Sequence, residues 1–154
     1  MHWITDFFTN PFAMIGLSSW ILAQVIKLII HTIVYKKFEI SRLFGDGGMP
    51  SGHSATVASL AVACALMRGT GSVEFAISGI LAIVVCHDAM GVRLETGKQA
   101  VILNEVVELY NILSKEKLPE VKLKEFVGHT PMQVLFGVLL GIVNALLMYN
   151  FIFK

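Results

Sequence analysis

The sequence predicts an all-α, polytopic membrane protein: a helix bundle with about four transmembrane helices and one further, interfacial amphipathic helix. Apolar residues make up 55% of the 154 residues and charged residues only 15%, whereas soluble domains have about 45–50% and about 25%. The apolar residues are gathered in four blocks, and the connections on one side carry nearly all the basic residues. The length indicates a single domain, residues 1–154.

The first and last spans are predicted at residues 12–35 and 131–152. Both segments contain the roughly 20 mostly apolar residues that a transmembrane helix needs. Pro11 and Pro131 stand at their starts, where a helix tolerates proline because the first N–H groups have no partner within the helix.

Two shorter spans are predicted between them, at residues 52–67 and 73–90. Each is near the lower length limit for crossing a bilayer. The segment Arg68-Gly-Thr-Gly71 provides a tight turn that joins them.

The connection that follows is predicted to form a cytoplasmic helical segment over residues 94–127. Its apolar residues recur on one helical stripe, at Ile102, Val106, Leu109, Tyr110 and Leu113. We expect this amphipathic helix to lie along the membrane surface and to end before Pro119.

The charge distribution predicts the orientation. Four spans place connections 36–49 and 91–128 on one side, with the following basic residues: Lys36, Lys37, Arg42, Arg93, Lys98, Lys115, Lys117, Lys122 and Lys124. Only Arg68 and Lys154 lie opposite, so the positive-inside rule places both long connections in the cytoplasm. The expected location is the plasma or inner membrane. A net charge of +1 gives no reason to expect a nucleic-acid partner.

The first polar constellation is Gly47-Gly-Met-Pro-Ser51-Gly52-His53, which leads directly into a predicted helix. A helix N-terminus presents free N–H groups and a positive dipole end, which suit a phosphate. Ser51 can donate to such an anion, and His53 can act as a general acid. The alternative is an ordinary loop-to-helix junction in which Ser51 is only a cap.

The second constellation is Gly128-His129-Thr-Pro-Met-Gln133, at the start of the last span. His129 and Gln133 share a helical face if the helix begins near His129. A histidine oriented by an acceptor is the usual arrangement for a nucleophile or base. The alternative is that His129 only caps the helix.

Three charged residues complete the set. Arg93 can clamp phosphate oxygens, and Asp88 can orient a histidine or an arginine or hold a metal; alternatively the two form an ion pair at the membrane boundary. Lys27 lies inside the first span, where a charge costs ~2.5–3.5 kcal/mol on insertion scales and suggests a function. Otherwise Lys27 extends toward the cytoplasmic face without a partner. All these residues are near, or can reach toward, one face.

The sequence resembles the type 2 phosphatidic acid phosphatase superfamily, which also includes vanadium haloperoxidases. Pro50-Ser-Gly-His53 looks like its second signature, and Gly128-His129 through Gln133 looks like its third. The divergent bacterial branch is the closer match, over segments that cover most of the chain in order: Ala23-Gln-Val-Ile-Lys27, Gly47 to Ala55, Asp88-Ala-x-Gly-Val-Arg93, Gly97-x-Gln99-Ala and Gly128-His-x-Pro.

The resemblance implies hydrolysis of a phosphomonoester through a phosphohistidine intermediate, without a metal or another cofactor. His129 would be the nucleophile, and His53 would protonate the leaving oxygen. Ser51 and the backbone at Gly52 would hold phosphate oxygens. The charge of the phosphate would be neutralised by Lys27 and Arg93.

The sequence departs from the family pattern at several positions. Gln133 stands where the superfamily has Asp and the divergent branch Glu, so it can orient the imidazole but cannot supply a negative charge. Leu123 occupies the place of an arginine six residues before His129, and Arg42 is the only nearby arginine before the second signature. A cytoplasmic site also differs from typical membrane members, whose sites face outward.

The leading hypothesis is therefore a membrane phosphatase acting on a polyprenyl or glycerolipid phosphate. The alternative is a non-catalytic lipid-phosphate binder or transporter that retains the anion site. Gly137-x-x-x-Gly141 would allow close packing within the chain or in a homodimer. We assign no role to Glu95, Gln99 or Asn104.

Overall fold

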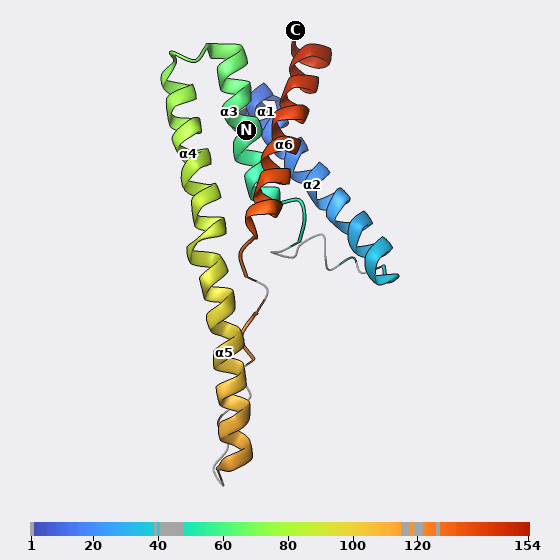
Figure 1. The fold of residues 1–154 in the computed structure, drawn as a ribbon. Coiled ribbons are helices and arrows are strands. Elements are labelled where there is room, and N and C mark those ends of the chain that lie inside the picture. Colours follow the sequence, from blue (N-terminus) through green and yellow to red (C-terminus); the bar gives the residue numbers. More distant parts are fainter. Residues whose placement is uncertain (1, 39, 41–47, 115–117, 119–121, 126) are drawn as a thin grey trace.

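The computed structural model describes residues 2–38, 40, 48–114, 118, 122–125 and 127–154, which form helices and their connections (Figure 1). Arg42 lies outside the described residues. The helices are α1 (His2–Thr9), α2 (Pro11–Tyr35), α3 (Gly52–Arg68), α4 (Val73–Met90), α5 (Val92–Leu113), α6 (Pro131–Met148) and a terminal π-helical turn, η2 (Tyr149–Phe153). The all-helical fold is confirmed.

The starts of the helices follow from their capping residues. The Asn10 side chain accepts hydrogen bonds from Phe12 N at 2.9 Å and Ala13 N at 3.4 Å, so α2 begins at Pro11. Ser72 caps α4 by accepting from Phe75 N at 3.1 Å. Each cap satisfies a backbone donor that would have no partner within the helix.

Helix α3 is the centre of the bundle and packs against α2, α4 and α6. Its buried face consists of small residues: Gly52, Ser54, Ala55, Ala58, Ser59, Ala63 and Cys64. The facing residues on α6 include Gly137 and Gly141. A Cβ on Gly137 would lie 2.5 Å from the Ser51 carbonyl oxygen, and one on Gly141 would overlap the Ala55 carbonyl oxygen. This glycine pair therefore packs within the chain.

A polar contact joins α2 to α6 in the interior. Asn144 Nδ2 donates to Ser19 Oγ at 2.8 Å and to Ser18 Oγ at 2.9 Å. Such interhelical hydrogen bonds stabilise helix association where water is excluded.

Among the described residues, three helical segments are long and apolar enough to cross a membrane: Pro11–Tyr35, Val73–Leu113 and Pro131–Phe153. The predicted count of about four is not confirmed, because α3 has only 17 residues and carries two serines, Ser54 and Ser59, on its buried face. The end of α2, the start of α3, the α4–α5 junction and the start of α6 lie toward the same end of the bundle, while the turn between α3 and α4 and the C-terminus lie toward the other (Figure 1).

Helix α5 continues the line of α4 and projects beyond the bundle (Figure 1). Hydrogen bonds continue through the junction, since Gly91 N donates to His87 O at 2.9 Å and Glu95 N donates to Gly91 O at 3.0 Å. If α4 crosses a bilayer, α5 therefore extends away from it and does not turn along its surface; the predicted interfacial position of this helix stays a prediction.

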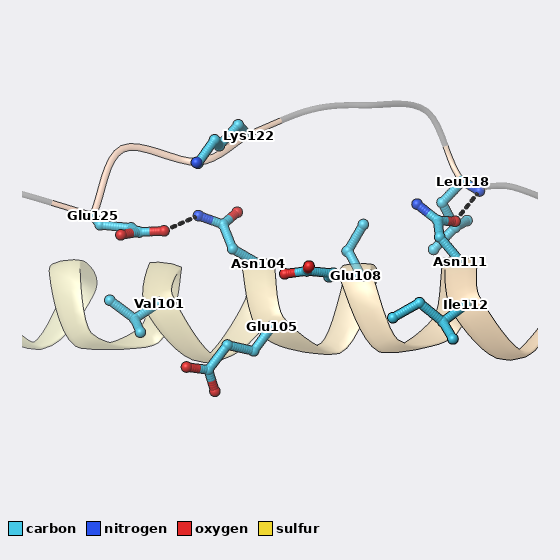
Figure 2. Close-up of a pocket in the computed structure, with 10 residues that line it drawn as sticks. Val101, Asn104, Glu105, Glu108, Asn111, Ile112, Leu118, Lys122 and Glu125 are labelled. Atoms are coloured by element: carbon cyan, nitrogen blue, oxygen red, sulfur yellow. Dashed lines mark hydrogen bonds between the residues drawn. The ribbon is translucent and has the colours of Figure 1, made fainter.

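Residues 118 and 122–125 run back beside α5, and we call them, together with α5, the α5 arm. Asn104 holds the returning segment through Leu123 N and O, both at 3.0 Å, and through Glu125 Oε1 at 2.8 Å. Farther out, Leu118 N donates to Asn111 Oδ1 at 2.7 Å. Figure 2 shows the groove of about 830 Å³ between them. Polar side chains on one face of α5 thus hold its covering segment.

Candidate active site

The starts of α3 and α6 meet directly. Ser51 N donates to the Gln133 carbonyl oxygen at 3.0 Å. Gly137, one turn along α6, leaves the space in which the Ser51 backbone sits. The two predicted signatures, 78 residues apart at Ser51 and His129, are thereby placed side by side.

Gln133 contacts His129, as their spacing predicted. The two residues do not share a helical face, because His129 precedes the helix, and Gln133 reaches back to it as part of a capping box. Helix α6 begins only at Pro131, with Thr130 as its N-cap. Gln133 Oε1 accepts from Thr130 N at 3.0 Å and lies 3.2 Å from His129 Nδ1, while Gln133 N donates to Thr130 Oγ1 at 3.4 Å. The reading of His129 as the helix cap is wrong, because Thr130 has that role.

This geometry indicates which imidazole nitrogen carries the proton. The backbone N–H of Thr130 is a donor, so the amide atom that faces it has to be the oxygen of Gln133. The same oxygen faces His129 Nδ1, which therefore donates its hydrogen. In the neutral ring Nε2 then keeps a lone pair, as a nucleophile requires.

Residues from the α4–α5 junction hold the backbone of this turn. His129 N donates to the Ala89 carbonyl oxygen at 3.0 Å. Gly128 has φ +84° and lies against the Arg93–Leu94 backbone so closely that a Cβ would overlap it. The His129 side chain is only 5% exposed.

Asp88 and Arg93 form an ion pair, with Arg93 Nε 2.5 Å from Asp88 Oδ2. This agrees with the ion-pair alternative. Both side chains are partly exposed, at 40% and 55%. The backbone contacts of Ala89 and Leu94 place the pair next to the His129 turn, and its solvent-facing position leaves the guanidinium reachable from outside.

Lys27 lies under the loop that precedes α3. A Cβ on Gly48, which has φ +87°, would lie 3.3 Å from Lys27 Cγ and 3.4 Å from Cδ. Lys27 is 7% exposed, so its stem is enclosed by protein. The structure thus brings Lys27 to the segment that leads into Ser51.

Ser51 is the N-cap of α3, as the structural alternative proposed. Its Oγ accepts from Ser54 N at 3.4 Å and lies 2.9 Å from Ser54 Oγ. Ser51 is fully buried and Gly52 is buried against Trp20, whereas His53 is exposed. The cap and the anion-binding reading are compatible, because a cap uses only some of the free N–H groups.

Sequence reasoning missed Gln24 as a site residue. It lies one turn before Lys27, is 8% exposed, and has an Oε1 atom that is buried without a hydrogen-bond partner among the described residues. The i, i+3 spacing to Lys27 was a signal, but the burial of the amide depends on the packing of α2 against α3.

The three unassigned residues lie away from this turn. Glu95 pairs with Lys98 at 2.6 Å on the exposed surface, Gln99 is exposed, and Asn104 holds the α5 arm. Within the described part of the chain, no group of three His, Cys, Asp or Glu side chains is arranged to hold a metal ion.

Two comparisons with known proteins found matches. Residues 8–144 match the family described as the divergent PAP2 family. The chain is also 39% identical over 155 residues to the uncharacterized membrane protein YuiD of Bacillus subtilis (strain 168), across 95% of this chain and 98% of that protein. No solved structure matches the chain.

Proposed function

We propose that this chain, which belongs to the divergent PAP2 family, hydrolyses a lipid phosphomonoester. Its apolar helices and its relative in Bacillus subtilis indicate a membrane protein. The observation that carries the proposal is the turn His129-Thr130-Gln133 beside the capped start of α3. It combines an oriented imidazole with a helix N-terminus suited to an anion.

In the proposed first step, His129 Nε2 attacks phosphorus and the bond from phosphorus to the lipid oxygen breaks. His53 gives its proton to the departing oxygen, and its exposed position suits a leaving group that lies outside the bundle. In the second step a water oxygen attacks phosphorus, His53 accepts the water proton, and the phosphorus–nitrogen bond breaks. Inorganic phosphate and His129 are restored.

The charge on the transferred group needs fixed partners. Ser51, Gly52, Lys27 and Arg93 are the proposed ligands of the phosphate oxygens. Lys27 is supported by its position under the loop before α3, and Arg93 by the contact of its backbone with Gly128. Asp88 orients Arg93 in this scheme. Such preorganised charge supplies most of the catalysis in phosphoryl transfer.

One feature favours the second candidate, a lipid-phosphate binder or transporter without catalysis. Gln133 is neutral and cannot stabilise the positive charge that develops on His129.

One experiment separates the candidates. The protein is reconstituted in vesicles that contain phosphatidic acid or a polyprenyl phosphate, and phosphate release is measured for the parent, His129→Ala and Gln133→Glu. Release by the parent that His129→Ala abolishes, with an acid-labile phosphoenzyme in the parent, supports the phosphatase. Phosphate-lipid binding with no release by any of the three proteins supports the binder.

The cytoplasmic orientation of the site is part of the proposal and rests on the basic residues of the two long connections. A reporter fused to the C-terminus tests it, and a cytoplasmic reporter would overturn it. A homodimer through α6 would have to use faces other than the Gly137–Gly141 pair, since that pair packs against α3.

A further inference from the structure

We propose that Gln24 is an additional phosphate ligand, whose side-chain amide donates to an oxygen of the phosphate held at the start of α3. This inference rests on the proposed function, because it assigns a further residue to the same anion site. It concerns binding, and it can be tested without catalysis.

The first argument is the state of the amide group. Gln24 is 92% buried, since only 8% of its surface is exposed. Its Oε1 has no hydrogen-bond partner within the described part of the chain. Native proteins pair nearly all buried polar atoms, so a buried amide without a partner calls for an explanation. A ligand that binds beside it is one such explanation.

The second argument is where the amide lies. Gln24 Cδ is 4.0 Å from the position that a Cβ on Gly52 would occupy, and Gly52 is the first residue of α3. The amide therefore faces the helix N-terminus, where backbone N–H groups point outward. Lys27, one turn along α2, contacts Gly48 in the loop that leads to the same helix start. The Gln24 amide and the Lys27 stem thus both lie beside the chain that enters α3.

The third argument is chemical. Oxygen and nitrogen of an amide are exchanged by a half-turn about the last side-chain bond, and they are assigned only by their hydrogen bonds. The atom without a partner is the acceptor Oε1, and a half-turn puts the donor Nε2 in its place. A phosphate accepts both from Nε2 and from the helix N–H groups. With Nε2 turned toward it, the phosphate joins Gln24, Lys27 and the start of α3 in one set of contacts.

The test measures binding of inorganic phosphate to the full-length protein in detergent, by calorimetry and by the phosphate-dependent rise in Tm. We expect Gln24→Leu to weaken binding by at least about tenfold, the usual effect of losing a hydrogen bond to a charged group. Without phosphate, its Tm should equal or exceed that of the parent, because an apolar side chain removes the unpaired amide. A purely structural role for Gln24 would lower that Tm.

Gln24→Glu keeps the shape of the side chain and places a negative charge beside the phosphate, so we expect it to abolish binding. This variant decides the matter if Gln24→Leu does not fold. Asn150→Leu, which removes an exposed amide in η2, beyond the far end of α6, is the matched control and should bind phosphate like the parent.

The outcomes separate this inference from the proposed function. Parent-like phosphate binding by Gln24→Leu and Gln24→Glu, together with loss of binding in Lys27→Met, would overturn the role of Gln24 and leave the anion site intact. A parent protein that does not bind phosphate at all would overturn both.

Discussion

The α3–α6 contact and the α5 arm both position residues of the candidate site, but with different kinds of surface. Between α3 and α6 the backbones touch, because Gly137 and Gly141 carry no Cβ, and every group in the contact is buried. Along the α5 arm the segments are held by side-chain hydrogen bonds of Asn104 and Asn111, and most of the apolar residues of α5 remain exposed. An interface in which backbones touch tolerates almost no added side-chain volume. The side-chain hydrogen bonds of the α5 arm, in contrast, can break without disturbing the bundle.

The largest expected effect comes from filling the backbone contact. In Gly141→Ala the new Cβ would overlap the Ala55 carbonyl oxygen and lie 3.0 Å from Ser59 N. We expect a loss of about 1–3 kcal/mol in unfolding free energy, the usual cost of overpacking a closed interface. The measurement is thermal unfolding in detergent.

Gly79→Ala is the matched control, since nothing lies within 4 Å of its Cβ position on α4. It should be neutral or stabilise by up to about 1 kcal/mol through helix propensity. Equal effects of the two alanines would contradict the described α3–α6 contact.

The next effect concerns the capping box at the start of α6. Gln133→Glu keeps an oxygen facing Thr130 N and His129 Nδ1 and adds a negative charge, so phosphate release should rise by about tenfold or more if His129 is the nucleophile. Gln133→Leu removes the acceptor, and we expect slower phosphate release and a loss of about 1 kcal/mol in unfolding free energy from the cap.

Imidazole ¹⁵N spectra give a second readout: the parent and Gln133→Glu should show hydrogen on Nδ1 of His129. An unchanged spectrum in Gln133→Leu would show that Gln133 does not set the tautomer.

A smaller, local effect is expected in the α5 arm. Asn104→Leu removes the hydrogen bonds to Leu123 and Glu125, at about 1 kcal/mol for each neutral bond. Hydrogen exchange at Leu123 should speed up while the Tm of the bundle changes little. Glu105→Gln is the control, because Glu105 points away from the returning segment (Figure 2). A fall in Tm as large as that of Gly141→Ala would mean that arm and bundle unfold together.

The smallest effect is expected for the Glu95–Lys98 pair. Both side chains are about 60% exposed, so Glu95→Gln should change unfolding free energy by well under 1 kcal/mol, and the change should disappear at high salt. A larger, salt-independent loss would place Glu95 among the residues that hold the arm.

Most helix bounds could be predicted because they depend on local chemistry. The predicted spans 12–35, 52–67 and 73–90 end within one residue of α2, α3 and α4, since prolines, capping serines and glycines mark those ends in the sequence. The alternation of spans also predicted that Ser51 and the His129 turn lie toward one face, but not that their backbones are in contact.

The rest depends on tertiary packing. The apolar stripe of α5 gave the periodicity of a helix but not its direction, which the hydrogen bonds through Gly91 determine. The contact between His129 and Gln133 was predicted, but the hydrogen bond that Gln133 Oε1 also accepts from Thr130 N was not, because it depends on the capping box at the start of α6. Gln24 could not be recognised, since an amide becomes exceptional only when packing buries it and leaves it unpaired.

The length of α3 has a further consequence for the substrate. Its 17 residues rise about 26 Å, less than the roughly 30 Å of a hydrocarbon core. If α3 crosses a bilayer that does not thin around it, the ends of the helix lie beneath the level of the headgroups. The anion site at the start of α3 would then be recessed toward the acyl chains. A phosphate bound directly to a long hydrocarbon chain reaches that depth without leaving the bilayer, whereas a water-soluble phosphate ester would first have to enter the hydrocarbon core.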